Sequence, residues 1–274
     1  DRTKEIILKG IKRILTIAGS DSGGGAGIQA DLKTITVLGG FGMSVITALT
    51  AQNTLGVHAV HEVPVEFIAA QFDAVVSDIG VDAAKTGMLS SAAVVEVVVE
   101  KIGQYGINKL VVDPVMTAKG GATLMEPGAR KAVMAKLLPL ALVVTPNIPE
   151  AEILTDVIIA SVSDMKAAAR IIHELGAQNV IVKGGHLIGA AADVLYDGHD
   201  FYEFPFVRVA TKDTHGTGCT FSAALATALA QGRSVREAMA AVEDYMAAVI
   251  GNSLRLGAGH GPVNHWVCPA PSGG

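Results

Sequence analysis

The sequence predicts an α/β fold built on a mainly parallel β-sheet that is covered by helices on both faces. Short apolar runs rich in Val and Ile alternate with segments whose apolar residues recur every three or four positions, which is typical of repeated strand–helix units. Half of the residues are hydrophobic and only 17% are charged, so a sizeable core can form. Aromatic residues are few, and a core of Ala, Val, Leu and Ile suits helices packed on buried parallel strands.

The strands can be placed in order along the chain. Short β-branched runs predict buried strands at residues 14–18, 43–51, 83–86, 109–112, 142–145 and 180–183. The pattern then changes between residues 193 and 209 to two alternating stretches around Asp197 and Gly198. Such a pattern predicts a β-hairpin.

Helical periodicity fills the intervals between these strands. It predicts helices at residues 28–38, 64–76, 91–102, 129–138 and 164–175, with a short one from residue 149. Ser163 and Asp164 are expected to cap the helix that ends at Leu175. Two further helices, beginning at Gly216 and Val235, complete the chain.

Composition limits the organisation and the partners. No linker or repeat interrupts the alternation, so we expect one domain over residues 1–274, with flexible ends at 1–11 and 268–274. A net charge of −5 argues against nucleic acid, and no apolar run reaches the ~20 residues of a membrane span. Only two cysteines, Cys219 and Cys268, and an N-terminus without the apolar core of a secretion signal predict a cytoplasmic location.

Polar residues gather directly after the predicted strands. In an open parallel sheet, ligands bind beyond the carboxyl ends of the strands, so these residues are candidates for one site. They are Gly19 to Gly27, Gln52 and Asn53, Lys85 to Met88, Asp113, Asn147 to Glu150, and Lys183 to His186.

Several of these residues also have a purely structural interpretation. Asn147 and Glu150 have the spacing of a helix capping box, although Glu150 and Asp113 could instead hold Mg²⁺ with phosphates. Asp113 precedes a proline and could simply belong to a turn, and Lys183 could be solvated or pair with phosphate. Gln52 presents a donor and an acceptor together, which suits the edge of an aminopyrimidine.

The segment from Thr211 to Ala224 joins a polar turn to the start of a helix. Gly216 and Gly218 are expected where free backbone N–H groups can bind an anion. Cys219 falls in the first turn of that helix, a position that lowers the pKa of a thiol from its usual value of about 8.5. A glycine-rich turn with a small core cysteine is the alternative. His215 could touch phosphate or support the turn.

Seven motifs together resemble the hydroxymethylpyrimidine/phosphomethylpyrimidine kinases of thiamin biosynthesis, which belong to the ribokinase-like superfamily. The resemblance runs from about Leu15 to His265 and keeps the order of the motifs. They are A-G-S-D-S-G-G-G-A-G-I-Q-A-D-L-K-T (18–34), S-V-I-T-A-L-T-A-Q-N-T (44–54), K-T-G-M-L (85–89), V-V-D-P-V-M (111–116), T-P-N-I-P-E-A (145–151), V-K-G-G-H (182–186) and T-H-G-T-G-C-T-F-S-A-A (214–224).

The resemblance implies a three-layer α/β/α sandwich, usually dimeric, that phosphorylates a hydroxymethylpyrimidine and then its monophosphate with ATP and Mg²⁺. It further implies roles for individual residues. The pyrimidine pocket is expected to contain Gly19, Asp31, Gln52 and Met88. The magnesium and nucleotide phosphates are expected near Asn147, Glu150, Asp113, Lys183 and Thr217. Gly216 to Cys219 are expected to form the anion hole and to supply the base.

Many ribokinase-like enzymes carry aspartate where this chain has Cys219, but the pyrimidine kinases and one group of pyridoxal kinases share the cysteine. Pyridoxal kinase is therefore the alternative function. In the cysteine-bearing pyridoxal kinases a second cysteine is expected after the V-D-P-V-M strand, where this chain has Met116-Thr117-Ala118-Lys119. The absence of that cysteine and the presence of Gln52 favour the pyrimidine.

Two functions of other classes are also compatible with parts of the sequence. A non-catalytic ligand sensor would keep the pocket, but the presence of Glu150, Lys183 and Cys219 argues against it. Thiol chemistry such as acyl transfer would need a base beside Cys219, and His215, four residues away, is the sole candidate in that segment.

Overall fold

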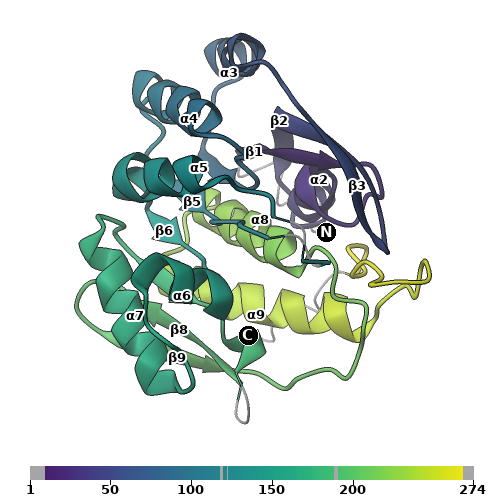
Figure 1. The fold of residues 1–274 in the computed structure, drawn as a ribbon, viewed down its shortest axis with the longest axis vertical. Coiled ribbons are helices and arrows are strands. Elements are labelled where there is room, and N and C mark those ends of the chain that lie inside the picture. The colour runs from purple at the N-terminus through teal and green to yellow at the C-terminus, as the bar shows by residue number, and fades with distance from the viewer. Residues whose placement is uncertain (1–9, 118–119, 122, 188–190, 268–274) are drawn as a thin grey trace.

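The structure is a computed structural model that describes residues 10–117, 120–121, 123–187 and 191–267. The described residues form one nine-stranded sheet in the order β3-β2-β1-β4-β5-β6-β7-β8-β9 (Figure 1). Its strands are β1 (Arg13–Asp21), β2 (Phe41–Asn53), β3 (Gly56–Glu62), β4 (Ala83–Thr86), β5 (Leu110–Val112), β6 (Val143–Val144), β7 (Val180–Val182), β8 (Ala192–Tyr196) and β9 (Phe201–Pro205).

The sheet is parallel in its centre and antiparallel at both edges. Strands β2, β1, β4, β5, β6 and β7 run parallel, as predicted. The predicted hairpin is confirmed as β8 and β9, with Tyr196 paired to Phe201 around the turn. The sequence analysis missed β3, which pairs antiparallel with β2 and is exposed over most of its length, so that it has no buried apolar run to reveal it.

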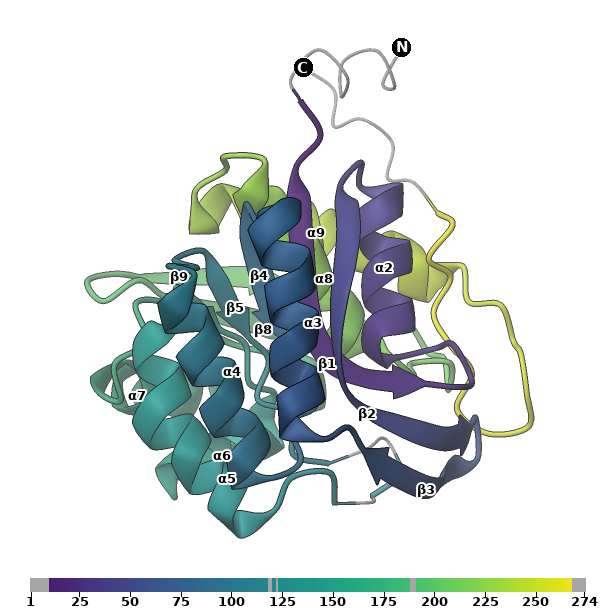
Figure 2. The ribbon, with the colours of Figure 1, turned by 90° about the horizontal axis from the view of Figure 1, so that it is seen from above.

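Helices cover both faces of the sheet, which confirms the three-layer α/β/α architecture (Figure 2). One face carries α3 (Val65–Asp78), α4 (Ala92–Gln104), α5 (Pro127–Ala132), α6 (Ile148–Thr155) and α7 (Val162–Glu174). The other carries α2 (Gly27–Val37), α8 (Thr217–Ala230) and α9 (Val235–Gly251). A π-helical turn at Val133–Leu137 and a 3₁₀ turn at Leu138–Leu140 extend α5.

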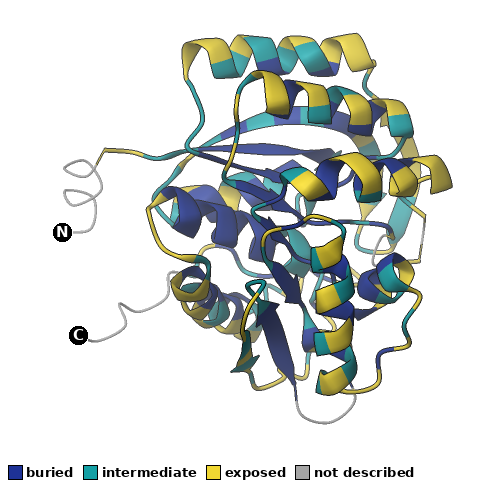
Figure 3. Ribbon diagram, turned by 90° about the vertical axis from the view of Figure 1, so that its left-hand side faces the viewer, coloured by how far each residue is buried: buried dark blue, intermediate teal, exposed yellow. Residues whose placement is uncertain are grey.

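Alternation along the strands divides the core into two layers. In β5, Leu110 and Val112 face the layer beneath α3 to α7, whereas Val111 faces the layer beneath α8 and α9. All three are buried, as both faces of a covered parallel strand must be. Figure 3 shows that strands inside the molecule are mostly buried, whereas the outer helices carry exposed sides.

Side chains define where the helices start. Ser91 and Ser234 cap α4 and α9, and Ser234 forms a capping box with Glu237. The N-cap of α7 lies two residues before the predicted one: it is Ser161, whose side chain accepts from the N–H of Asp164. Within the described part of the chain, no helix is long and apolar enough to span a bilayer.

Candidate active site

A cavity of about 790 Å³ lies beyond the carboxyl ends of the central strands, at the N-terminus of α8. The chain leaves β1 toward β2 and returns to β4 on the other side of β1, which is the switch point where open α/β sheets bind ligands. The residues of the predicted site that line this cavity are Gly19, Gln52, Met88, Asp113, Asn147, Glu150, Lys183, Gly216, Thr217, Gly218 and Cys219.

The N-terminus of α8 points its free N–H groups at the cavity because Gly216 makes a left-handed turn there. Gly216 has φ +84°, and a Cβ atom on it would lie 1.8 Å from the carbonyl oxygen of Gly25. Glycine is therefore required at this position. Thr217 opens the helix, and its hydroxyl donates to the carbonyl of Thr214 at 3.1 Å.

A buried ion pair lies next to this helix terminus. The Nζ of Lys183 lies 3.0 Å from Oδ1 of Asp113, which also accepts a hydrogen bond from the hydroxyl of Thr145. Burial alone would lower the pKa of Lys183, but the negative charges of Asp113 and Glu150 outweigh it and raise the pKa, so the ammonium group stays charged. A Cβ on Gly218 would be only 3.4 Å from Asp113 and 3.5 Å from Lys183.

Asn147 and Glu150 form the capping box of α6. The Asn147 side chain accepts from the N–H of Glu150, and the Glu150 carboxylate accepts from the N–H of Asn147, each at 2.9 Å. The capping interpretation is thus confirmed. Burial and the nearby Asp113 raise the pKa of Glu150 to about 7, a crowding that a bound cation would relieve.

The described residues contain no ready-made cluster of three or more metal-ligating side chains. The two carboxylates of Asp113 and Glu150 nevertheless suit Mg²⁺, which keeps several waters and binds through one or two carboxylates plus phosphates. The residues present therefore fit a magnesium ion that arrives with a nucleotide.

Cys219 is half-buried at the cavity wall, in the first turn of α8. Burial raises the pKa of its thiol to about 12; the charge of Lys85 opposes this rise, whereas Asp31 and Asp113 add to it. The prediction of a lowered pKa is therefore wrong for the unliganded protein. The loss of water around the sulfur raises the pKa by more than the positive end of α8 lowers it.

Asp31 does not line the cavity, contrary to expectation. It is fully buried on α2, where it pairs with Lys85 at 3.1 Å and accepts from the hydroxyl of Thr16 at 2.5 Å. The motif does not show which way the Asp31 side chain points, and in the structure this side chain lies on the side of α2 that faces β1 and β4. Asp31 lies behind the pocket wall, close enough for its charge to act on Cys219.

Gln52, Gly19 and Met88 form the opposite end of the cavity from Lys183. A Cβ on Gly19 would lie 3.2 Å from the sulfur of Met88, so the lack of a side chain leaves room beside that thioether. Oε1 of Gln52 lies 3.1 Å from the hydroxyl of Thr50, and its Nε2 lies 3.4 Å from Nε2 of His215.

The sequence analysis named the loop Gly19 to Gly27 without giving Asp21 a role, and it missed a second candidate altogether. Asp21 organises the loop after β1 by accepting from the N–H groups of Gly23, Gly25 and Ala26. An Asp two residues before glycines is a signal for such a turn and could have been used. The second candidate, the pair Asp193 and Glu243, joins residues that are fifty apart in sequence, and no local pattern announces it.

Asp193 and Glu243 are two carboxyl groups in contact at the wall of the cavity. Burial raises the pKa of Asp193 to about 6, and burial together with the charge of Asp193 raises that of Glu243 to about 9. Oε1 of Glu243 is covered, and no N–H or O–H group of the described residues donates to it. The two carboxyl groups can therefore hydrogen-bond only while they share a proton.

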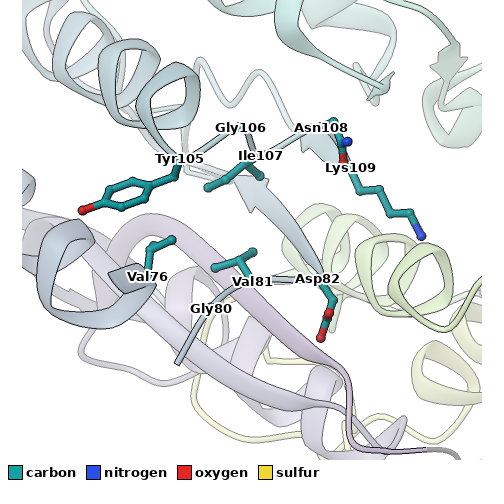
Figure 4. A pocket seen from close by; sticks show the side chains of 9 residues that line it. All are labelled: Val76, Gly80, Val81, Asp82, Tyr105, Gly106, Ile107, Asn108 and Lys109. Atoms are coloured by element: carbon teal, nitrogen blue, oxygen red, sulfur yellow. The ribbon is translucent and has the colours of Figure 1, made fainter. Parts of the chain in front are cut away.

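A second hollow of about 240 Å³ lies at the opposite end of the sheet, before β4 and β5 (Figure 4). Its two charged side chains are already paired: Asp82 binds Arg13 at 2.8 Å, and Lys109 donates to the carbonyl of Leu229. It contains none of the predicted site residues, so the chemistry belongs to the larger cavity.

Comparisons with known proteins identify the family. The family described as Phosphomethylpyrimidine kinase matches residues 21–264. The chain belongs to this family. It is 50% identical to the hydroxymethylpyrimidine/phosphomethylpyrimidine kinase of Bacillus subtilis over 93% of this chain and 95% of that protein.

One further sequence relative and one solved structure are also similar to the chain. The chain is 56% identical to the thiamine biosynthesis bifunctional protein ThiED of Geobacter sulfurreducens, over 92% of its own length but only 52% of that protein. The chain thus spans about half of that relative. The structure of Staphylococcus aureus pyridoxal kinase with AMP-PCP and pyridoxal superposes with a TM-score of 0.87 at 39% identity, and the match covers 94% of each chain. The predictions of the kinase family and of the ribokinase-like fold are confirmed.

The shared proton makes Glu243→Gln a test of the Asp193 pair. Both carboxyl groups have higher pKa values in the folded protein than their ordinary 3.8 and 4.5. Their contribution to stability is therefore greatest at low pH and is lost as the pH rises through about 6 and about 9. An amide at position 243 donates to Asp193 without titrating.

We expect Glu243→Gln to raise the free energy of unfolding at pH 8.5 by roughly 1–2 kcal/mol, the scale of one buried unpaired polar group, and to change it little at pH 5. Urea unfolding at both pH values measures this difference, with Asp244→Asn on the exposed side of α9 as the control. An equal effect at both pH values would show that no proton is shared.

Proposed function

We propose that the protein transfers the γ-phosphate of ATP to the hydroxymethyl group of 4-amino-5-hydroxymethyl-2-methylpyrimidine, and then phosphorylates the monophosphate to the diphosphate. The observation that carries the proposal is the layout of one cavity. It has an anion-binding helix terminus beside Lys183 at one end and the amide of Gln52 at the other, with Cys219 in the wall. The names of the relatives that match along nearly their whole length support the same reaction.

The nucleotide end of the cavity supplies positive charge for the phosphates. The ammonium of Lys183 and the N–H groups of Gly216 to Cys219 bind and orient them. Asp113 and Glu150 would hold Mg²⁺, which when bound neutralises charge on the phosphates. Asn147 acts indirectly, because its N–H fixes the carboxylate of Glu150.

The acceptor end orients the ring. Gln52 offers one donor and one acceptor to the edge of the aminopyrimidine, and Met88 packs against the ring above Gly19. The hydroxymethyl oxygen would then face the γ-phosphate, with Cys219 at its side.

Cys219 is proposed to take the hydroxyl proton as the O–P bond to the substrate forms and the bond to ADP breaks. The thiol is neutral in the unliganded site, so it serves as a base only once its own proton has left. Lys85 already favours the thiolate. We infer that a cation held by Asp113 and Glu150 would lower the pKa of the thiol from this raised value, because a nearby positive charge favours the thiolate.

If Cys219 is the base, Cys219→Ala should lower kcat by ~10²–10⁴, the usual contribution of general acid–base catalysis. In the wild type, kcat should rise with pH until the thiol titrates in the loaded enzyme, and this dependence should vanish in the alanine variant. Steady-state kinetics from pH 6 to 9.5 measure both effects. Near-normal turnover by Cys219→Ala would rule out this role.

The substrate class is tested by an ATP-coupled assay that compares hydroxymethylpyrimidine, its monophosphate and pyridoxal. We expect kcat/KM for the pyrimidine to exceed that for pyridoxal by at least about tenfold, because a hydrogen-bonding site strongly disfavours ligands that leave its groups unpaired. A strong preference for pyridoxal would support the alternative function instead. Absence of ATP consumption with all three compounds would favour the sensor.

We further propose that the protein acts in the cytoplasm as a homodimer that pairs through β2 and β3. Strand β3 forms the edge of the sheet and is exposed from residue 58 to 62. Leu49 and Val60 on these two strands are each 46% exposed, which is unusual for large apolar side chains beside an open sheet edge. Sedimentation velocity should show a dimer that Val60→Lys dissociates; a wild-type monomer would contradict this.

A further inference from the structure

The side chains of Asp21, His215 and Gln52 meet at the acceptor end of the cavity. Each contact between them needs a donor on one side and an acceptor on the other. Nε2 of His215 lies 2.8 Å from Oδ2 of Asp21 and 3.4 Å from Nε2 of Gln52. The side chains of Asp21 and His215 are only 3% and 12% exposed, so water does not easily complete their hydrogen bonds. The atom that carries the hydrogen in one contact therefore determines which group can donate in the next.

Asp21 determines which nitrogen of His215 carries hydrogen. Besides His215, its carboxylate accepts from the N–H groups of Gly23 and Ala26 at 2.8 Å and of Gly25 at 3.1 Å. Burial would raise the pKa of Asp21, but the hydrogen bonds from His215 and the loop outweigh it and lower the pKa. An ionised carboxylate only accepts, so the hydrogen of the 2.8 Å contact belongs to Nε2 of His215.

This assignment conflicts with an Nε2 of Gln52 that faces the same ring nitrogen, because two N–H donors would then point at each other. A second conflict lies at the other end of the amide. The hydroxyl of Thr50 is 3.0 Å from the carbonyl of Ser20 and 3.1 Å from Oε1 of Gln52, yet it has one hydrogen for two acceptors.

Turning the amide by half a rotation removes both conflicts. Oε1 of Gln52 then faces the Nε2–H of His215 as a second and weaker acceptor beside Oδ2 of Asp21, so that no two donors point at each other. Nε2 of Gln52 donates to the hydroxyl of Thr50, whose hydrogen goes to the carbonyl of Ser20. The two ends of an amide have nearly the same shape, so the hydrogen bonds decide its orientation. We propose that His215, held by Asp21, is a positioning residue that fixes Gln52 with Oε1 toward His215 and Nε2 toward Thr50.

The orientation sets what the pocket recognises. The remaining lone pair of Gln52 lies on the His215 side, and its remaining N–H lies on the Thr50 side. A ring that carries an amino group next to a ring nitrogen can pair with both when the amino group points toward His215. A ligand edge without a donor at that place leaves Oε1 partly unsatisfied. The identity of this ligand rests on the function proposed above, whereas the orientation of the amide does not.

The protonation of His215 tests the orientation in the unliganded protein. Long-range ¹H–¹⁵N spectra of labelled protein distinguish the two neutral forms of the ring, and the signal that disappears in His215→Gln identifies residue 215. We expect hydrogen on Nε2 at pH 7.5. A bare Nε2 with hydrogen on Nδ1 would overturn the proposal, whatever the enzyme phosphorylates.

Two substitutions of His215 separate positioning from general support of the fold. The amide nitrogen of glutamine reaches the place of Nε2 and can donate to both Asp21 and Gln52, whereas asparagine is one methylene shorter. We expect His215→Asn to raise KM for the aminopyrimidine by about tenfold or more, the effect of losing one good hydrogen bond in a buried site. His215→Gln should stay within about threefold of the wild type, and KM for ATP should change little in either variant.

Equal losses in the two variants, or an equal rise of KM for ATP, would contradict a positioning role. Thermal unfolding of both variants shows whether the fold is intact. A wild type that leaves aminopyrimidines unphosphorylated but has hydrogen on Nε2 would refute the proposed substrate and support the orientation of Gln52.

Discussion

The site depends on the ion pair between Lys183 and Asp113 beneath the N-terminus of α8. Asp113 follows β5 and Lys183 follows β7, with β6 between the two strands, and both side chains lie near Gly218 of α8. The close approach of the helix to the strand ends depends on the left-handed turn at Gly216, where a Cβ would clash with the carbonyl oxygen of Gly25. Sheet, helix and ion pair thus place the first N–H groups of α8 beside Lys183, an arrangement that suits the phosphate group proposed to bind there.

Burial controls the other charges of the cavity. Lys85 and Asp31 are both fully buried and neutralise each other directly behind the wall that carries Cys219. The thiol, Glu150 and Glu243 have raised pKa values because each lost more water than its neighbours replace. The cavity thus disfavours additional negative charge except at the helix terminus and Lys183, and we expect phosphate to bind at that end for this reason.

Periodicity located the buried strands and the helices because these elements have apolar faces, and β4 was predicted to the residue. The exposed β3 lacks such a face and was missed. The positions of Gln52, Lys183 and Cys219 after predicted strands or at a helix start predicted one shared cavity, because the carboxyl ends of parallel strands lie at the same edge of a sheet. All three line the cavity. Sequence spacing could not reveal that Asp31 faces inward or that the pKa of the Cys219 thiol is raised. Both properties depend on the residues that pack around these side chains.

The most direct measurement of the central claim is the affinity of the protein for AMP and for AMP-PCP, by calorimetry, in the wild type and in Lys183→Met. If Lys183 holds the outer phosphates, its loss should weaken AMP-PCP by about 10–100-fold, the strength of a charged hydrogen bond, and leave AMP within about twofold. Lys183→Arg keeps the charge and serves as the control. Equal weakening of both nucleotides, or none, would contradict the account.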